Sequence, residues 1–323
     1  MSEGSTQGAD ALQAGRVLLT GAAGMLGGQL LRAAPAGFEV VGTDLATPER
    51  TGPCAAFVGG VDLTQLDAVR ALFAEHGPFV GVLHPAAYTA VDKAESDAEL
   101  ARKVNADAAE NVAKAAAEAQ CPMVAVSTDF VFDGRKTTPY VETDPVSPLG
   151  VYGRTKLEGE ERARAAWPEG VRVVRTQWLY GPLRGGPGGH FPATMLRLAK
   201  ERDQLRVVAD QLGSPTSTLE LAPALWDVLR LGAAGVYHAS CEGVCSWHEL
   251  AQATLAIAGH SGVRVDPCTT ADYPTPAERP AYSVLDCSKL TALRGRSLAP
   301  WRQALEDYLE MELAQEAGRA DAP

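Results

Sequence analysis

Tyr152 and Lys156 place a phenol and an ammonium one helical turn apart, because residues i and i+4 share a helix face. Tyrosine has an ordinary pKa near ~10, and a neighbouring cation stabilises the phenolate and lowers that pKa. In carbonyl reduction, such a phenol gives its proton to the oxygen while hydride reaches the carbon. An isolated pair of this kind is usually part of a solvated helix face, so the chemistry needs further support.

A hydroxyl upstream supplies that support. Thr128 ends an apolar run that starts at Met123 and predicts a buried strand. In doubly wound folds, ligands bind outside the carboxyl ends of the strands. Thr128 could therefore hydrogen-bond a substrate carbonyl, although a strand-end cap would look the same. Taken in this order, Thr128, Tyr152 and Lys156 favour a catalytic interpretation.

A glycine-rich turn precedes these residues, between a predicted strand at 16–20 and a predicted helix at 25–34. Glycines there would allow a tight turn and a close approach of phosphate to the backbone, and the helix N-terminus offers free N–H groups. The spacing also occurs in ordinary turns, but its place between strand and helix favours a dinucleotide site. The predicted contacts are Gly21, Gly24, Met25, Leu26 and Gly27.

Two acidic residues follow, Asp44 at the end of the next predicted strand and Asp62 further along the chain. Asp44 lies about 20 residues after Gly24, where a carboxylate accepts from the adenosine ribose 2′-hydroxyl and would repel a 2′-phosphate. The predicted cofactor is therefore NADH or NADPH, with NADH slightly favoured, and Leu45 is expected beside it. Asp62 and Leu63 are expected near the adenine, although Asp62 fits a helix cap or turn equally well.

Alternating strand and helix patterns would position these groups. Strands are predicted at 16–20, 39–44, 80–84, 123–127 and 171–175, and helices at 25–34, 66–76, 98–119 and 151–166. Such alternation implies right-handed crossovers and a parallel sheet covered on both faces. The predicted fold class is α/β, a doubly wound Rossmann sheet with a smaller C-terminal substrate lobe.

The pattern changes after Tyr180, where a loop is expected at 185–189 and proline-rich segments follow. We expect a disordered lead-in at 1–15 and a dinucleotide-binding domain at 16–180 plus about 218–262. The substrate lobe would comprise 181–217 plus about 263–315. These bounds rest on composition and turn signals alone.

The composition of the chain restricts the broad class. It has 323 residues, of which 46% are hydrophobic and 21% charged, with a net charge of -11. This balance predicts a globular protein without nucleic-acid or membrane partners. The opening residues lack a signal-peptide pattern, and the six scattered cysteines predict reduced thiols in a cytoplasmic protein.

Several longer motifs resemble the extended short-chain dehydrogenases, and within them the dTDP-4-dehydrorhamnose reductase family. The resemblance runs from Val17 to about Leu309. It is carried by the stretches 21–27, 86–95, 127–134, 151–157, 175–181, 210–216 and 279–283. Of these, 88–95 and 128–134 are far more specific than the glycine turn.

The resemblance implies hydride transfer from NAD(P)H to the C4 keto group of a dTDP-4-keto-6-deoxy-L-sugar. By this analogy Tyr152 is the acid, Lys156 tunes it and holds the nicotinamide ribose, and Thr128 orients the carbonyl. The cofactor would also contact Ala86, Ala87 and Tyr88. The nucleotide-linked ketosugar would contact Thr128, Asp129, Trp178 and Arg279. Arg279 suits a diphosphate because guanidinium binds phosphate with two parallel bonds.

Some positions depart from the family pattern. Phe130 stands where relatives usually have tyrosine, His84 and Pro85 replace asparagine and a small residue, and Gln177 replaces a smaller residue. These changes put the sugar identity in doubt. Some relatives bridge a dimer with a metal through a glutamate on the first helix; the matching residue is Gln29, so no metal is predicted.

Three alternatives stay open. A sugar-nucleotide 4,6-dehydratase or epimerase shares the fold, but a dehydratase needs a second carboxylate after Asp129, where this chain has Phe130. A 4-ketoreductase for another nucleotide-deoxysugar, as in antibiotic sugar pathways, fits as well. A non-catalytic, cofactor-binding regulatory subunit, like that of methionine adenosyltransferase, would retain similar motifs. Either a monomer or a homodimer is expected.

Overall fold

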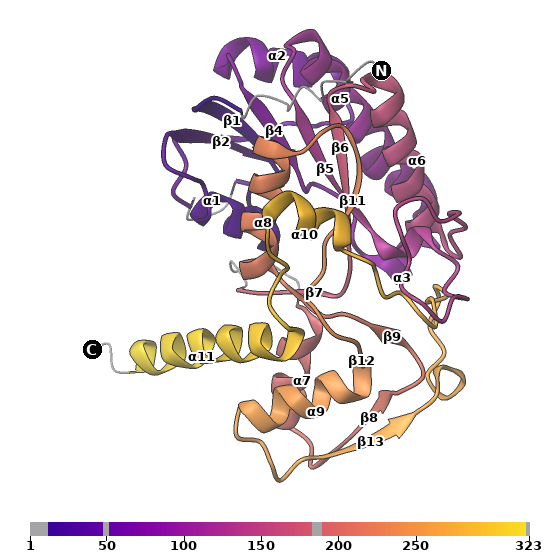
Figure 1. Ribbon diagram of the computed structural model, residues 1–323. Helices are drawn as coiled ribbons and strands as arrows, with labels where there is room; N and C mark the ends of the chain where they lie inside the picture. Colours follow the sequence, from indigo (N-terminus) through magenta and orange to yellow (C-terminus); the bar gives the residue numbers. More distant parts are fainter. Residues whose placement is uncertain (1–11, 48–51, 183–188, 321–323) are drawn as a thin grey trace, which may run out of the picture.

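The computed structural model describes residues 12–47, 52–182 and 189–320. Its centre is a seven-stranded parallel sheet in the order β11-β6-β5-β4-β1-β2-β3 (Figure 1). The strands are β1 Gly15–Thr20, β2 Phe38–Asp44, β3 Ala56–Gly59, β4 Gly81–His84, β5 Met123–Thr128, β6 Val171–Thr176 and β11 Gly235–His238. The predicted doubly wound Rossmann architecture is confirmed.

Helices cover both faces of this sheet because the central strands are buried on both sides. Val17 and Leu19 of β1 join the core formed with α1 and α8, while Leu18 between them joins the core under α2 and α5. This alternation is the two-residue period of a strand. The covering helices are α1 Met25–Arg32, α2 Leu66–His76, α5 Ala108–Glu118, α6 Val151–Ala166, α8 Thr218–Leu231 and α10 Ser288–Arg294.

The helix predicted at 98–119 is interrupted by a π-helical turn. It consists of α4 Ala98–Arg102, the π-helix η1 Lys103–Asp107, and α5. The wider turn sets the backbone of Asn105 against α6, where a Cβ on Gly159 would lie only 2.2 Å from the Asn105 carbonyl oxygen. Alanine content predicts the helix but not this contact between distant segments, and π-turns often mark functional sites.

Shorter elements connect the sheet to a second part of the molecule. They are α3 Val91–Ala94, the 3₁₀ helices η2 Asp129–Val131 and η3 Thr270–Asp272, and four two-residue strands. These strands form two pairs, β7 Leu179–Tyr180 with β10 Thr216–Ser217, and β9 Leu212–Gly213 with β12 Cys245–Ser246.

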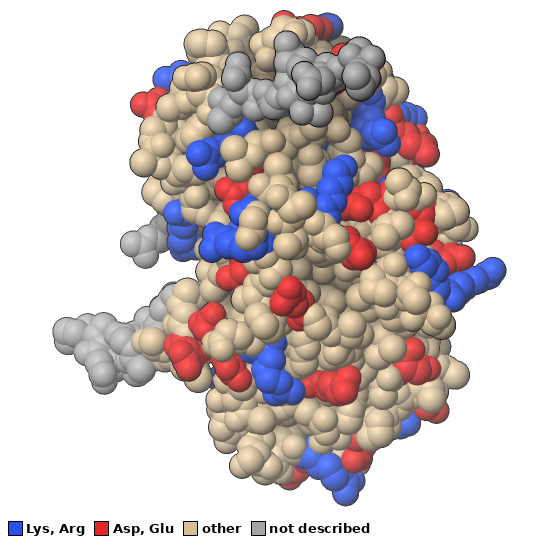
Figure 2. Space-filling view, viewed as in Figure 1, with Lys and Arg blue, Asp and Glu red and all other residues tan. Residues whose placement is uncertain are grey.

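The smaller part contains α7 Phe191–Ala199, β8 Gln204–Val208, α9 Trp247–Ile257 and β13 Arg264–Cys268. β8 pairs in parallel with β13, and α9 packs on α7 and both strands. The last helix, α11 Trp301–Ala320, projects from the body in Figure 1. Figure 2 shows acidic and basic side chains interspersed over the visible face of both parts.

The expected domain bounds can be compared with these contacts. The range 218–262 assigned to the dinucleotide-binding domain includes α9, which packs with the smaller part, whereas α10 packs on α8 and β11. Within the lead-in, Leu12 donates its backbone N–H to the Arg230 carbonyl at 3.0 Å, and residues 1–11 lie outside the described residues, as do 183–188 of the expected loop. In the described part of the chain, no helix is long and apolar enough to cross a membrane.

Candidate active site

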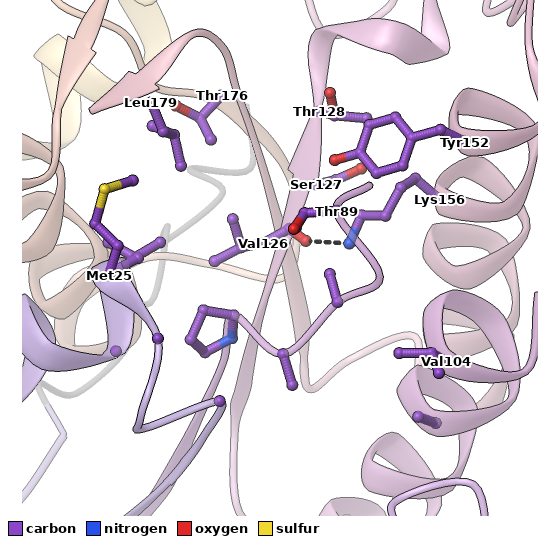
Figure 3. Close-up of a pocket in the computed structure, with 18 of the residues that line it drawn as sticks. Met25, Thr89, Val104, Val126, Ser127, Thr128, Tyr152, Lys156, Thr176 and Leu179 are labelled. Atoms are coloured by element: carbon purple, nitrogen blue, oxygen red, sulfur yellow. Dashed lines mark hydrogen bonds between the residues drawn. The ribbon is translucent and has the colours of Figure 1, made fainter. Parts of the chain in front are cut away.

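A cavity of about 630 Å³ opens at the carboxyl ends of the central strands (Figure 3). It is lined by most of the residues predicted from the sequence: Gly21, Gly24, Met25, Leu26, Gly27, Asp44, Leu45, Asp62, Leu63, Ala86, Ala87, Thr128, Asp129, Tyr152, Lys156 and Trp178. Tyr88 and Arg279 are not among the lining residues. The dinucleotide and catalytic motifs therefore share one cavity.

The glycine turn has geometric reasons for its composition. Gly21 has a φ of +59°, in the left-handed region that favours glycine. A Cβ at Gly27 would lie 2.1 Å from the Gly21 carbonyl oxygen, so a side chain there would displace the turn. Gly24 is the N-cap of α1 and makes no side-chain cap bond, which leaves N–H groups at the helix start for an anionic ligand.

The two predicted adenosine contacts differ in their present partners. Asp44 Oδ2 accepts from the backbone N–H of Ala23 at 3.1 Å, which fixes the end of β2 to the glycine turn. Asp62 Oδ1 accepts from both the backbone N–H and the hydroxyl of Thr64, at 2.9 and 2.7 Å. Asp62 thus forms the turn that its alternative interpretation predicts, although it lines the cavity.

Tyr152 and Thr128 meet at the buried end of the cavity. The Thr128 hydroxyl donates to Asp129 Oδ1 at 3.0 Å and accepts from the backbone N–H of Phe130 at 3.2 Å. Burial raises the pKa of Tyr152 to about 12, a hydrogen bond with Thr128 opposes the rise, and the Asp129 charge adds to it. Burial also raises the pKa of Asp129 to about 6.

Lys156 is directed at the backbone rather than at the phenol. Its Nζ donates to the Val126 carbonyl oxygen at 2.7 Å, as the dashed line in Figure 3 shows. Burial lowers the pKa of Lys156 to about 8, against the charge of Glu160. The sequence predicts that Lys156 lowers the pKa of Tyr152, and this is wrong for the described conformation, because burial raises that pKa and the opposing contribution comes from the Thr128 hydrogen bond.

The motif at 86–95 is hydrogen-bonded to α6, the helix that carries Tyr152 and Lys156. Asn105 in the π-turn accepts from the Tyr88 backbone N–H at 2.8 Å and donates to the Thr155 hydroxyl at 3.0 Å. Glu95 Oε1 accepts from the Val151 N–H at 2.8 Å, at the first residue of α6. The Tyr88 hydroxyl bonds Asp97 at 3.1 Å, so Tyr88 anchors the loop while the two alanines before it line the cavity.

Arg279 is held outside the cavity by an ion pair. Its guanidinium donates to both carboxylate oxygens of Asp92, at 2.6 and 2.8 Å, and also to the Ala277 carbonyl. This pair closes the loop after Tyr273 onto α3. In this structure Arg279 does not line the cavity, and its role as a diphosphate contact stays a prediction.

Trp178 lines the cavity in a strained conformation. Its φ of +50° is unusual for a bulky side chain. Its indole lies parallel to that of Trp247, with ring centroids 3.6 Å apart and planes 9° apart. Gly213 leaves room for the ring, because a Cβ there would lie 2.5 Å from Trp178. Trp247 is the first residue of α9 and was not predicted from the sequence.

Further lining residues were also not predicted as contacts. The polar ones are Thr64, Thr89, Ser127, Thr176, Gln177 and His190. His190 is the N-cap of α7, where Nδ1 accepts from the Ala193 N–H at 3.3 Å and Nε2 lies 3.0 Å from the Tyr308 hydroxyl. Burial lowers the pKa of His190 to about 4. A histidine just before a Phe-Pro helix start is the only signal that the sequence holds for it.

Comparison with known proteins identifies the family. The family model described as RmlD substrate binding domain matches residues 15–313. A dTDP-4-dehydrorhamnose reductase of Mycolicibacterium smegmatis is 41% identical over 92% of this chain and 85% of its own length. The chain belongs to the dTDP-4-dehydrorhamnose reductase family.

Two other similar proteins are relevant to the choice of substrate and cofactor. A probable dTDP-4,6-dihydroxy-2-methyloxan-3-one 4-ketoreductase of Streptomyces antibioticus is 40% identical over 93% of this chain and 97% of its own length. The crystal structure of dTDP-4-dehydrorhamnose reductase from Bacillus anthracis in complex with NADP is 34% identical. It has a TM-score of 0.82 and covers 92% of this chain and 99% of its own.

The departures from the reductase family pattern have definite places in the structure. Phe130 lines the cavity with its ring edge-on to Tyr152, at 5.5 Å and 80°. Gln177 Oε1 accepts from the Ser214 N–H at 3.1 Å and from the Ser283 hydroxyl at 3.0 Å. This oxygen therefore holds two neighbouring segments of the chain together. Gln29 is buried in α1. Within the described ranges, no group of three or more His, Cys, Asp or Glu residues could hold a metal.

Proposed function

We propose that the protein is an NAD(P)H-dependent reductase of a dTDP-4-keto-6-deoxy-L-sugar, and that it converts dTDP-4-dehydrorhamnose to dTDP-L-rhamnose. The observation that carries this proposal is the single cavity that holds both the glycine turn and the set Thr128, Tyr152 and Lys156. Membership of the reductase family supports the same reaction.

The residues around the cavity fit a nicotinamide dinucleotide. The open turn at Gly21 and Gly24 suits the diphosphate, Asp44 an adenosine ribose, and Lys156 the second ribose. When bound, the nicotinamide supplies the hydride. We also propose that NADH is slightly favoured, because Asp44 would repel a 2′-phosphate, although the relative from Bacillus anthracis contains NADP.

The acid is Tyr152, which is partly buried. A pKa raised to about 12 keeps the phenol protonated over the physiological range. The phenol then gives up its proton only to the strongly basic oxygen that develops at the reduced carbon. Thr128 positions that oxygen, and the charge of Lys156 stabilises the phenolate that remains.

A second candidate is reduction of a different dTDP-4-ketosugar. The relative from Streptomyces antibioticus is almost as similar as the one from Mycolicibacterium smegmatis. Phe130 presents an apolar edge where a tyrosine would offer a hydroxyl, which favours a sugar with one hydroxyl fewer. We also infer a cytoplasmic location and a monomer or homodimer; six free cysteines support the location.

The deciding experiment follows oxidation of NADH and NADPH with dTDP-4-dehydrorhamnose formed in place by upstream enzymes. We expect rapid turnover of at least one cofactor. Cofactor binding without turnover of this sugar, but with turnover of a dTDP-4-ketosugar that lacks a further hydroxyl, would establish the second candidate. A stoichiometric enzyme partner and no turnover of any ketosugar would instead indicate a regulatory subunit.

A further inference from the structure

A third charged residue continues the catalytic face of α6. Glu160 lies one turn after Lys156 and two turns after Tyr152, so the three side chains point to the same side of the helix. The neighbouring charged residues Glu158 and Arg162 are half-buried on the other side, whereas Glu160 is only 4% exposed. A carboxylate at this depth requires a compensating partner.

That partner is Arg175 of β6, which is also 4% exposed. Its Nε donates to both Glu160 oxygens, at 3.0 and 3.2 Å, and its Nη2 donates to Oε2 at 2.7 Å. The guanidinium also lies over the Phe132 ring, at 5.2 Å. Arg175 pairs with Ser127 in the sheet register, next to Thr128. The ion pair thus joins the catalytic helix to the strand beside the catalytic threonine.

A small separate cavity links Glu160 to the lysine. It lies behind Lys156 and is lined by His84, Asn105, Ser127, Lys156 and Glu160 among others. The Ser127 hydroxyl has no hydrogen-bond partner among the described residues, and one Lys156 donor is used by Val126. Among the described residues that line this cavity, Glu160 is the one that carries a negative charge.

The other charged groups packed around α6 are engaged elsewhere or are neutral. Asp107, Glu110 and Arg102 pair with Arg162, Lys114 and Glu158 on the far side of the helix. Glu95 caps the start of α6. On the lysine side, burial lowers the pKa of His84 to about 3, so its imidazole is neutral near pH 7. Asp129 of η2 lies beyond Tyr152 and bonds Thr128.

We propose that Glu160, fixed by Arg175, is a positioning residue of the reductase: its carboxylate keeps the buried Lys156 ammonium charged and holds the Tyr152–Lys156 face of α6 against β5 and β6. Burial alone lowers the pKa of Lys156, and the Glu160 charge opposes this effect. Without Glu160, a larger fraction of Lys156 would be neutral at the pH of catalysis, and a neutral amine would not stabilise the phenolate.

The energetic cost of this ion pair supports a functional role. A buried salt bridge rarely stabilises a fold more than apolar residues of the same volume would, because both charges must be desolvated. Arg175 also keeps one donor, Nη1, without a partner in the described part of the chain. An apolar pair would fill this site without the desolvation cost of two charges, but it could not stabilise the charged form of Lys156.

The test compares Glu160→Gln with Glu158→Gln, the same chemical change two residues away on the solvent side of α6. The first readout is the titration of the Lys156 side chain by NMR in lysine-labelled protein without cofactor, with Lys156→Arg to identify its signal. We expect Glu160→Gln to lower the midpoint by about one pH unit. Glu158→Gln and the charge-conserving Glu160→Asp should leave it nearly unchanged.

The second readout is the pH profile of kcat, which rests on the proposed reduction. We expect the basic limb for Glu160→Gln to move down with the NMR midpoint. If Glu160→Gln does not fold, Glu160→Gln with Arg175→Met leaves no unpaired buried charge and carries the same test. An unchanged Lys156 midpoint in the folded variant would overturn this proposal. Failure to reduce any ketosugar would overturn the proposed function but leave the NMR test intact.

Discussion

The indole of Trp247 lies flat against that of Trp178, and it joins the first turn of α9 in the smaller part to a residue that lines the cavity. The contact depends on the antiparallel pairing of β9 with β12, because Trp247 directly follows Ser246, which pairs with Leu212. The Trp247 Nε1 also donates to Gln211 at 3.1 Å, so the supporting ring is itself fixed.

Trp247→Leu should therefore raise KM for the sugar nucleotide by about two- to tenfold and change kcat little, since a stacked pair contributes roughly 0.5–1.5 kcal/mol. The strained backbone of Trp178 would lose its support. Trp247→Phe keeps a stacking face and serves as the control. Steady-state kinetics and the near-ultraviolet circular dichroism of the coupled indoles provide the readout. Unchanged KM and dichroism in the leucine variant would exclude this role.

Tyr152→Phe removes one hydroxyl from the buried end of the cavity. We expect kcat to fall by about 10²- to 10⁴-fold, the usual contribution of a positioned acid, while cofactor affinity is retained. The measurement combines turnover with cofactor titration by fluorescence. A variant as fast as the parent would show that another group protonates the substrate.

Asp44→Asn tests cofactor choice without removing the acceptor for Ala23. The amide oxygen can still accept from that N–H, which is 3.1 Å from the present carboxylate, whereas the charge is lost. We expect the affinity for NADH to fall or stay constant and that for NADPH to rise several-fold, measured by binding titration of both cofactors. Equal changes in the affinities for NADH and NADPH would show that Asp44 does not contact the adenosine ribose.

Phe130→Tyr adds the hydroxyl that the family pattern leads us to expect at this position. Phe130 lines the cavity and its ring meets Tyr152 edge-on, so a hydroxyl added to this ring would change the lining of the cavity. If the natural substrate lacks one hydroxyl, the variant should improve kcat/KM for dTDP-4-dehydrorhamnose relative to the more deoxygenated sugar. The ratio of the two values, measured in competition, decides. A ratio that stays constant would mean that Phe130 does not select the sugar.

Acid should destabilise the fold through three buried histidines. Burial lowers the pKa of His84 and His238 to about 3 and that of His190 to about 4. Below pH ~6.5 the unfolded chain then binds more protons, so stability is lost as pH falls towards 4, by at most about 1.4 kcal/mol per pH unit for each histidine. Asp129, with its raised pKa of about 6, opposes the loss between pH ~4 and 6.

Urea unfolding between pH 4 and 7 measures this slope. His190→Asn, which still caps α7, should make the slope shallower. A free energy of unfolding that does not change between pH 4 and 7 would show that these histidines do not have lowered pKa values in the folded protein.

Five of the seven strands of the central sheet could be predicted because they are apolar runs, as in β1 and β5. The outer strands β3 and β11 are short and only partly buried, and the sequence analysis does not predict them. Tyr152 and Lys156 could be predicted because they share one helix. Contacts between segments that are distant in the sequence could not be predicted. Nothing in the local sequence shows that Asp92 satisfies Arg279, and Trp247 reaches the site only through the β9–β12 pair. The π-turn at Asn105 follows from its fit against Gly159, which propensity does not contain.

The position of β11 beside β6 affects how the chain is made. β6 ends at Thr176, but its outer neighbour begins only at Gly235, after the first elements of the smaller part. On a ribosome that adds ~5–20 residues per second, β6 would present an open edge for roughly 3 to 12 seconds. Exposed edges recruit other chains. Crowded expression should therefore produce aggregates that form during synthesis, and slower growth at low temperature would reduce them by lowering the number of unfinished chains present together.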